Sequence, residues 1–185
     1  MKLVALLVSL FFSAALFAQN NSGPDLDVYG AYAHGSNFGI GQSGWLGSAA
    51  YSFSDRLAAE ADLSGGYGSK SLGPLGVIIP GLPKTIHSHL HSFDVGPRVM
   101  FRNSSDKADA FGHLLFGFSH TNVSAAGASQ SDTSFSWALG GGADYFFKSH
   151  LGARVQLDWL RTNFFSQGDN HARFAIGLVY SFRGR

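Results

Sequence analysis

Three histidines alternate with other residues in the segment His87-Ser88-His89-Leu90-His91. Residues i, i+2 and i+4 of a β-strand share one face, so the three imidazoles would lie side by side. Imidazole nitrogens are frequent ligands of Zn²⁺ and Cu²⁺. No carboxylate follows until Asp94, so a polar surface segment is the favoured interpretation. We therefore predict no metal site and no cofactor, and the His triplet is the candidate to be checked.

Another histidine stands two residues before a serine, in His34-Gly35-Ser36-Asn37-Phe38-Gly39. This segment is similar to the His-x-Ser-Asn motif of the outer-membrane lipid A deacylases, in which a His activates a Ser nucleophile. The acid that should orient the His is missing, because residues 44–54 contain no Asp or Glu. A chance match in a loop is favoured, and the prediction is that the protein is not an enzyme.

Charged residues interrupt segments that are otherwise apolar or made of small residues. If the charged faces of these segments line the inside of a barrel, the charges must be paired. Glu60 with Arg98, and Arg154 with Asp144 or Asp158, are the expected pairs. His113 is a further candidate, and the predicted lumen set is Glu60, Asp62, Asp94, Arg98, Asp144, Arg154, Asp158 and Arg173. A salt-bridge plug is the favoured interpretation, and a narrow gated pore lined by these charges is the alternative.

The elements that must hold these residues are β-strands. Apolar and polar residues alternate with a period of 2 through most of the chain, and 24 Gly, 17 Phe, 6 Tyr and 3 Trp fit a barrel composition. The predicted strands span residues 26–33, 44–54, 57–68, 88–102, 109–121, 134–147, 151–163 and 172–183. Short connections at 55–56, 103–108 and 148–150 alternate with longer ones at 34–43, 69–87, 122–133 and 164–171. This alternation predicts an all-β, eight-stranded antiparallel up-and-down transmembrane β-barrel.

Side-chain size decides which face of each strand points outward. An eight-stranded barrel has a narrow interior, so the many large aromatic residues must face lipid. The predicted membrane-interface aromatics are Trp45, Tyr51, Phe53, Phe101, Trp137, Tyr145, Phe147, Trp159, Tyr180 and Phe182. The closing strand is similar to the C-terminal insertion signal of bacterial outer-membrane barrels at Gly177, Tyr180 and Phe182. Arg183-Gly184-Arg185 follows the Phe, which is usually terminal in that family.

The first residues predict export. Lys2 precedes an apolar run that ends in small residues at Ala18, which is the pattern of a cleaved secretory signal peptide. The predicted domains are therefore a signal peptide at 1–18 and a barrel at 19–185. The chain has no Cys, so disulfides and thiolate metal sites are excluded. The net charge of +1 and the absence of a basic stripe argue against nucleic acid as a partner.

Several segments carry a family resemblance. They are 44–45, 61–65 (Ala-Asp-Leu-Ser-Gly), 95–99 (Val-Gly-Pro-Arg-Val), 140–145 and 154–162. The chain resembles the OmpA-type eight-stranded barrels grouped as the porin-family outer membrane protein beta-barrel domain. The resemblance implies a Gram-negative outer membrane, with outer-membrane lipid, lipopolysaccharide and the barrel-assembly machinery as partners.

The favoured function is a structural or surface-interaction role through the extracellular loops. The apolar loop at 69–87 is the candidate contact for an extracellular partner, because apolar surface that reaches solvent often marks an interaction site. A narrow pore for small solutes or ions is the alternative, and a lipid A-modifying hydrolase is the least favoured function.

Overall fold

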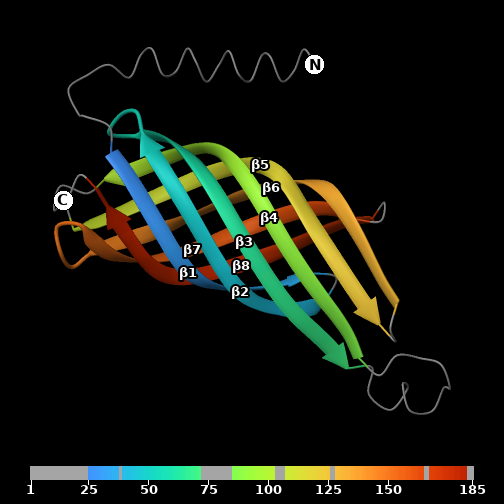
Figure 1. The fold of residues 1–185 in the computed structure, drawn as a ribbon. Coiled ribbons are helices and arrows are strands. Elements are labelled where there is room, and N and C mark those ends of the chain that lie inside the picture. The colour runs from blue at the N-terminus through green and yellow to red at the C-terminus, as the bar shows by residue number, and fades with distance from the viewer. Residues whose placement is uncertain are drawn as a thin grey trace, which may run out of the picture.

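The computed structural model describes residues 25–37, 39–71, 85–102, 107–125, 128–164 and 167–182. They form a closed barrel of eight antiparallel strands in the order β1 to β8 (Figure 1). The strands are β1 Asp25–Asn37, β2 Ile40–Ser52, β3 Leu57–Ser71, β4 Thr85–Arg102, β5 Ala108–Ala125, β6 Ala128–Phe146, β7 Leu151–Phe164 and β8 Gln167–Ser181. The expected signal peptide and Arg183-Gly184-Arg185 lie outside the described residues.

Each strand pairs with its neighbours in sequence, and β8 pairs with β1 to close the barrel. The closing register joins Asp27 to Ser181 at one end and Gly35 to Arg173 toward the other. We call the end where β1 begins and β8 finishes the inner end, and the opposite end the outer end. The connections β2–β3, β4–β5 and β6–β7 lie at the inner end, as the up-and-down topology requires.

The outer connections differ from the sequence prediction. Long connections were expected at 34–43, 122–133 and 164–171, but only residues 38–39, 126–127 and 165–166 separate the strands there. The expected connection 69–87 is reduced to 72–84. The physical reason is that hydrogen-bonded pairing continues into polar sequence, for example to the pair Ala125 and Ala128. The loss of apolar alternation marks the end of the apolar band and not the end of the strand.

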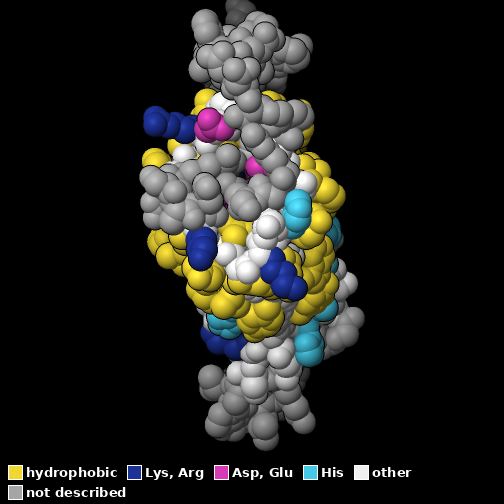
Figure 2. Space-filling model, turned by 90° about the vertical axis from the view of Figure 1, so that its left-hand side faces the viewer, with side chains coloured by type: hydrophobic (Ala, Val, Ile, Leu, Met, Phe, Trp, Pro, Cys, Tyr) yellow, Lys and Arg dark blue, Asp and Glu magenta, His cyan; other side chains and the backbone are white. Residues whose placement is uncertain are grey.

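The two faces of each strand differ as the side-chain sizes predict. In β7, buried and exposed residues alternate along the whole strand. Charged, polar and small residues predominate on the interior faces, while most of the large apolar residues face outward. Seen from the inner end, hydrophobic side chains cover much of the described outer surface (Figure 2). No helix in the described part of the chain is long and apolar enough to cross a membrane.

An aromatic side chain marks the point on every strand where the outward face changes from apolar to polar. These eight boundary aromatics are 44% to 63% exposed, and they are Tyr32, Trp45, Tyr67, Phe93, Phe118, Phe135, Trp159 and Phe174. Two residues further out, the side chain is polar on every strand except β8. Aromatic residues of membrane barrels concentrate at the two lipid–water interfaces. The ring of eight boundary aromatics around the barrel therefore marks the outer edge of the apolar band.

Candidate functional site

The interior of the barrel holds a set of buried charges that we call the lumen network. Its nine members are at most 7% exposed, and they are Glu60, Asp62, Asp94, Arg98, His113, Asp144, Arg154, Asp158 and Arg173. The period of 2 places them there, because each occupies the small or polar face of its strand. A buried charge is tolerated only with partners, so the contacts among them decide what the lumen can do.

Arg173 of β8 holds the outer part of the network together. Its guanidinium donates to Asp158 at 2.7 Å and 3.0 Å, and to Asp62 at 2.9 Å. A further donor reaches the Ser64 hydroxyl at 2.8 Å. Asp62 and Ser64 belong to β3, which is not a neighbour of β8 in the sheet. The Arg173 side chain therefore crosses part of the lumen instead of lying along one wall.

Arg154 and Arg98 share the carboxylate of Asp144. Arg154 donates to its two oxygens at 2.6 Å and 2.8 Å, which is the bidentate geometry of a strong ion pair. Arg98 approaches the same carboxylate at 3.4 Å and Glu60 at 3.8 Å. Of the two partners that the sequence allowed for Arg154, the structure therefore brings it to Asp144.

His113 connects the two halves of the network. Its Nδ1 lies 2.8 Å from Glu60 and its Nε2 lies 2.9 Å from Asp158. A carboxylate can only accept hydrogen bonds, so this geometry suits a histidine that donates from both nitrogens. One chain of contacts then runs across the lumen through Asp62, Arg173, Asp158, His113, Glu60, Arg98, Asp144 and Arg154. The remaining member, Asp94, accepts from Ser136 at 2.7 Å.

Buried inward aromatic residues were not foreseen, and two of them contact guanidinium groups. Phe111 lies under two guanidinium groups, 3.8 Å from that of Arg98 and 4.6 Å from that of Arg154. Tyr29 lies 4.8 Å from the Arg154 guanidinium. The expectation that aromatic residues face outward fails here, because a ring face can stabilise a cation. The sequence does contain a sign of this orientation. Phe111 stands two residues from both Asp109 and His113, so the three side chains share one face of the strand.

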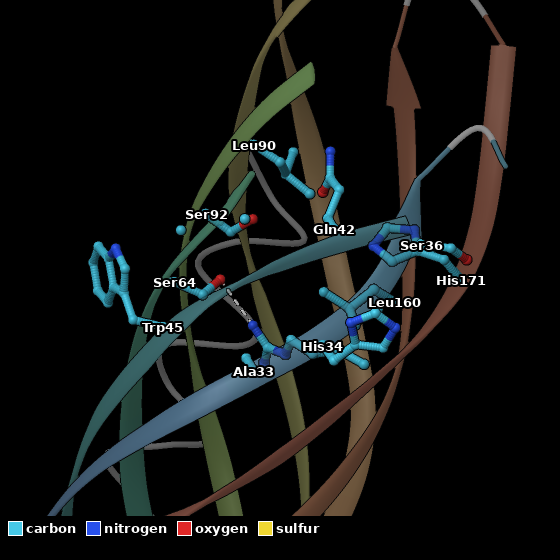
Figure 3. Close-up of a pocket in the computed structure, with 14 residues that line it drawn as sticks. Ala33, His34, Ser36, Gln42, Trp45, Ser64, Leu90, Ser92, Leu160 and His171 are labelled. Carbon is cyan, nitrogen blue, oxygen red and sulfur yellow. Dashed lines mark hydrogen bonds between the residues drawn. The ribbon is translucent and has the colours of Figure 1, made fainter. Parts of the chain in front are cut away.

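A small cavity lies at the outer side of the lumen network. Its volume is about 40 Å³, enough for a few water molecules, and Arg173 and His171 line it. Ser64, Ser92 and Gln42 also line the cavity (Figure 3). Arg173 also donates to Asp62 and Asp158, so the cavity adjoins the outer part of the lumen network.

Comparison with known proteins identifies the fold and the family. The family model for the outer membrane protein beta-barrel domain matches residues 3–182. The chain belongs to this family. A search of curated proteins finds no match.

Solved structures of outer-membrane barrels share the fold. Neisserial surface protein A superposes with a TM-score of 0.62 at 14% identity, covering 86% of this chain and 97% of that one. Ail, the attachment invasion locus protein of Yersinia pestis, gives 0.53 at 14% identity with the same coverage. The N-terminal barrel domain of Pseudomonas aeruginosa OprF gives 0.52 at 15% identity, covering 85% and 97%. These likenesses show the barrel fold, and the family match supports the outer membrane as the location.

The His-x-Ser segment of this outer-membrane barrel lies on β1, beyond the boundary aromatic Tyr32. Both His34 and Ser36 are exposed. The His34 Nδ1 lies 3.0 Å from the hydroxyl of Ser43, which is its cross-strand partner on β2. One ring nitrogen of His34 is therefore within hydrogen-bond distance of a serine other than Ser36.

The His triplet lies on the outside of β4. His87, His89 and His91 are exposed, whereas Ser88 and Leu90 between them are buried. Within the described residues, no group of three or more His, Asp or Glu side chains is arranged to hold a metal ion. The shared face that the spacing predicts is present, without a metal-binding geometry.

The predicted interface aromatics lie on the outward face. Tyr51, Phe101, Tyr145, Phe147, Tyr180 and Phe182 gather at the inner end and are 44% to 64% exposed, while Phe53 there is half-buried. Trp45 and Trp159 belong to the boundary aromatics, and Trp137 lies half-buried one step below Phe135. Tyr51 with Phe53, and Tyr180 with Phe182, pack edge to face. In the insertion-signal segment, Gly177 faces inward, opposite to the two aromatics.

Proposed function

We propose that this protein is a non-conducting outer-membrane barrel that presents the outer ends of β3 to β6 as a surface for interaction. The observation that carries the proposal is the continuous chain of contacts across the lumen. Eight buried charged side chains on six strands take part in it, and the Phe111 ring lies against the guanidinium groups of Arg98 and Arg154. An ion that crossed the barrel would have to separate pairs whose partners are already desolvated, which is costly.

The outer ends of β4, β5 and β6 support the second half of the proposal. These strands are longer than the others and remain paired from the boundary aromatics to Ala125 and Ala128. The side chains beyond the boundary are mostly Ser, Thr, Asn, Gln and His. A paired, polar sheet outside the apolar band is a rigid surface that faces water. We propose an extracellular partner for it and for the adjoining segment 69–87, with lipopolysaccharide around the apolar band and the barrel-assembly machinery acting on β8.

The first test is electrical. We expect the folded protein to give no single-channel steps in planar bilayers, because an ion would have to separate the buried ion pairs of the lumen network. Folding is checked on the same sample by its heat-modifiable migration in gels. Steps whose size changes in both Glu60→Gln and Arg98→Gln would support the pore instead, since these two side chains face each other at 3.8 Å inside the lumen.

The second test concerns which end faces outward. The chain has no Cys, so a single introduced thiol reports one position. We expect a membrane-impermeant maleimide to label Ser131→Cys, on the exposed outer part of β6, in intact cells. Lys148→Cys, in the exposed inner connection between β6 and β7, is the matched control and should react only after the outer membrane is permeabilised. The reverse pattern would overturn the orientation.

A further inference from the structure

Four exposed imidazoles gather on the outer face of β4 and β5. We call His87, His89, His91 and His120 the histidine patch. Their neighbours along the same strands are at most 8% exposed and face inward; these neighbours are Ser88, Leu90, Ser119 and Thr121. The four imidazoles therefore project from the outside of the barrel wall.

The patch begins immediately beyond the boundary aromatics. Phe93 and Phe118 are cross-strand partners and belong to the ring that marks the edge of the apolar band. His91 and His120 are the next outward residues and are also partners. A side chain two strand positions beyond the boundary lies in the headgroup layer, where lipid phosphates are found. The patch is thus continuous with the lipid-facing surface.

Neighbouring side chains hold three of the rings in place. The Tyr67 ring on β3 packs edge to face against His89 at 5.4 Å and His91 at 5.7 Å between centroids. The Nδ1 of His120 lies 2.7 Å from the hydroxyl of Thr133 on β6. These contacts give the patch a fixed arrangement, unlike that of long flexible cations.

The charges around the patch favour an anion. Apart from the histidines, the titratable groups on the adjoining strand ends are Tyr67 and Lys70 on β3 and Asp132 on β6. Lys70 donates to the carbonyl of Gly39 at 3.5 Å. The Cα partner of Asp132 is Thr121, which is fully buried, so Asp132 is placed on the inward face of the sheet. The outward face of the described strand ends therefore carries imidazoles and no carboxylate.

We propose that the histidine patch is an acid-dependent binding surface for the phosphate groups of outer-leaflet lipids. Histidine is the side chain that gains a positive charge as pH falls from about 8 to about 5. Two charged residues directly opposite each other on paired strands repel, and His91 and His120 are such a pair. A phosphate that accepts hydrogen bonds from both rings removes this repulsion. This proposal is independent of whether the lumen conducts.

The test follows each imidazole separately by NMR in phosphatidylcholine nanodiscs that contain increasing fractions of phosphatidylglycerol, whose charge is constant over this pH range. At about pH 5, we expect the signals of His91 and His120 to shift in a saturable way. We expect half of the shift at about a fivefold lower phosphatidylglycerol fraction than His34 requires, because one additional cation beside an anionic bilayer has roughly that effect on binding. At about pH 8, the saturable shift should be absent.

His34 is the matched control, because it also stands two residues beyond a boundary aromatic, Tyr32, but outside the histidine patch. His120→Gln should raise the fraction that His91 needs by about fivefold, whereas His34→Gln should leave it unchanged. If His34 and His91 reach half of their shift at the same phosphatidylglycerol fraction, the effect is general attraction by the membrane and the proposal is overturned. Equal shifts with inorganic phosphate alone would also overturn it, because the site would then bind a soluble anion.

Discussion

Replacing Arg173 with methionine is expected to lower the free energy of unfolding by about 3–5 kcal/mol, the range for breaking a buried ion pair by removing one partner. Arg173 donates to Asp158 and to Asp62 in the outer part of the network. Without it, two carboxylates that are at most 1% exposed lose their principal cation. The cost comes mainly from those remaining charges and not from the lost contacts themselves.

The measurement is urea unfolding in lipid vesicles, followed by tryptophan fluorescence and by migration in gels. Arg161→Met is the control, because Arg161 lies on the exposed face of β7 just beyond Trp159. We expect that control to change the stability by less than about 0.5 kcal/mol, as for most surface substitutions. Arg173→Lys should fall between the two, since it keeps the charge but cannot reproduce the geometry of the guanidinium. Equal stability of Arg173→Met and Arg161→Met would contradict the assigned role of the network.

The sequence is sufficient to predict the barrel because two signals agree along most of its length. The period of 2 locates the strands, and the size difference between the faces tells which one meets lipid. The charges could be assigned to the lumen for the same reason, since Glu60 and Arg98 stand at small-residue positions beside apolar neighbours. These signals depend on local alternation, which a single sequence contains in full.

Contacts between distant strands could not be predicted in the same way. Whether Arg154 reaches Asp144 or Asp158 depends on the stagger between strands, which places Arg154 directly opposite Asp144 on β6. The crossing of Arg173 to Asp62 depends on barrel closure. The outer ends of the strands were not predicted, because hydrogen-bonded pairing beyond the apolar band does not require an apolar face. The inward position of Phe111 was not predicted, because side-chain volume was considered without the attraction between a ring and a cation.

Substituting Gly177 with alanine is expected to disturb the seam where β8 closes on β1. Gly177 pairs with Ala31, and an added Cβ would lie 2.5 Å from the Ala31 Cα and 2.7 Å from its Cβ. It would also collide with the backbone carbonyl of Gly30. Overpacking typically costs about 1–3 kcal/mol, and we expect the upper part of that range because the colliding atoms include backbone, which cannot rotate away.

Gly30→Ala is the matched control on the same seam. A Cβ at Gly30 would meet nothing within 4 Å, because Gly30 faces outward next to its partner Leu178. That variant should be neutral or slightly stabilising, since alanine reduces the freedom of the unfolded chain. Refolding into lipid vesicles without assembly proteins is the decisive measurement. If Gly177 acts only as part of an insertion signal, Gly177→Ala will refold with wild-type stability in vitro and fail only in cells. If the close approach of β8 to β1 requires glycine, the loss of stability will appear in the purified protein, while Gly30→Ala remains normal in both settings.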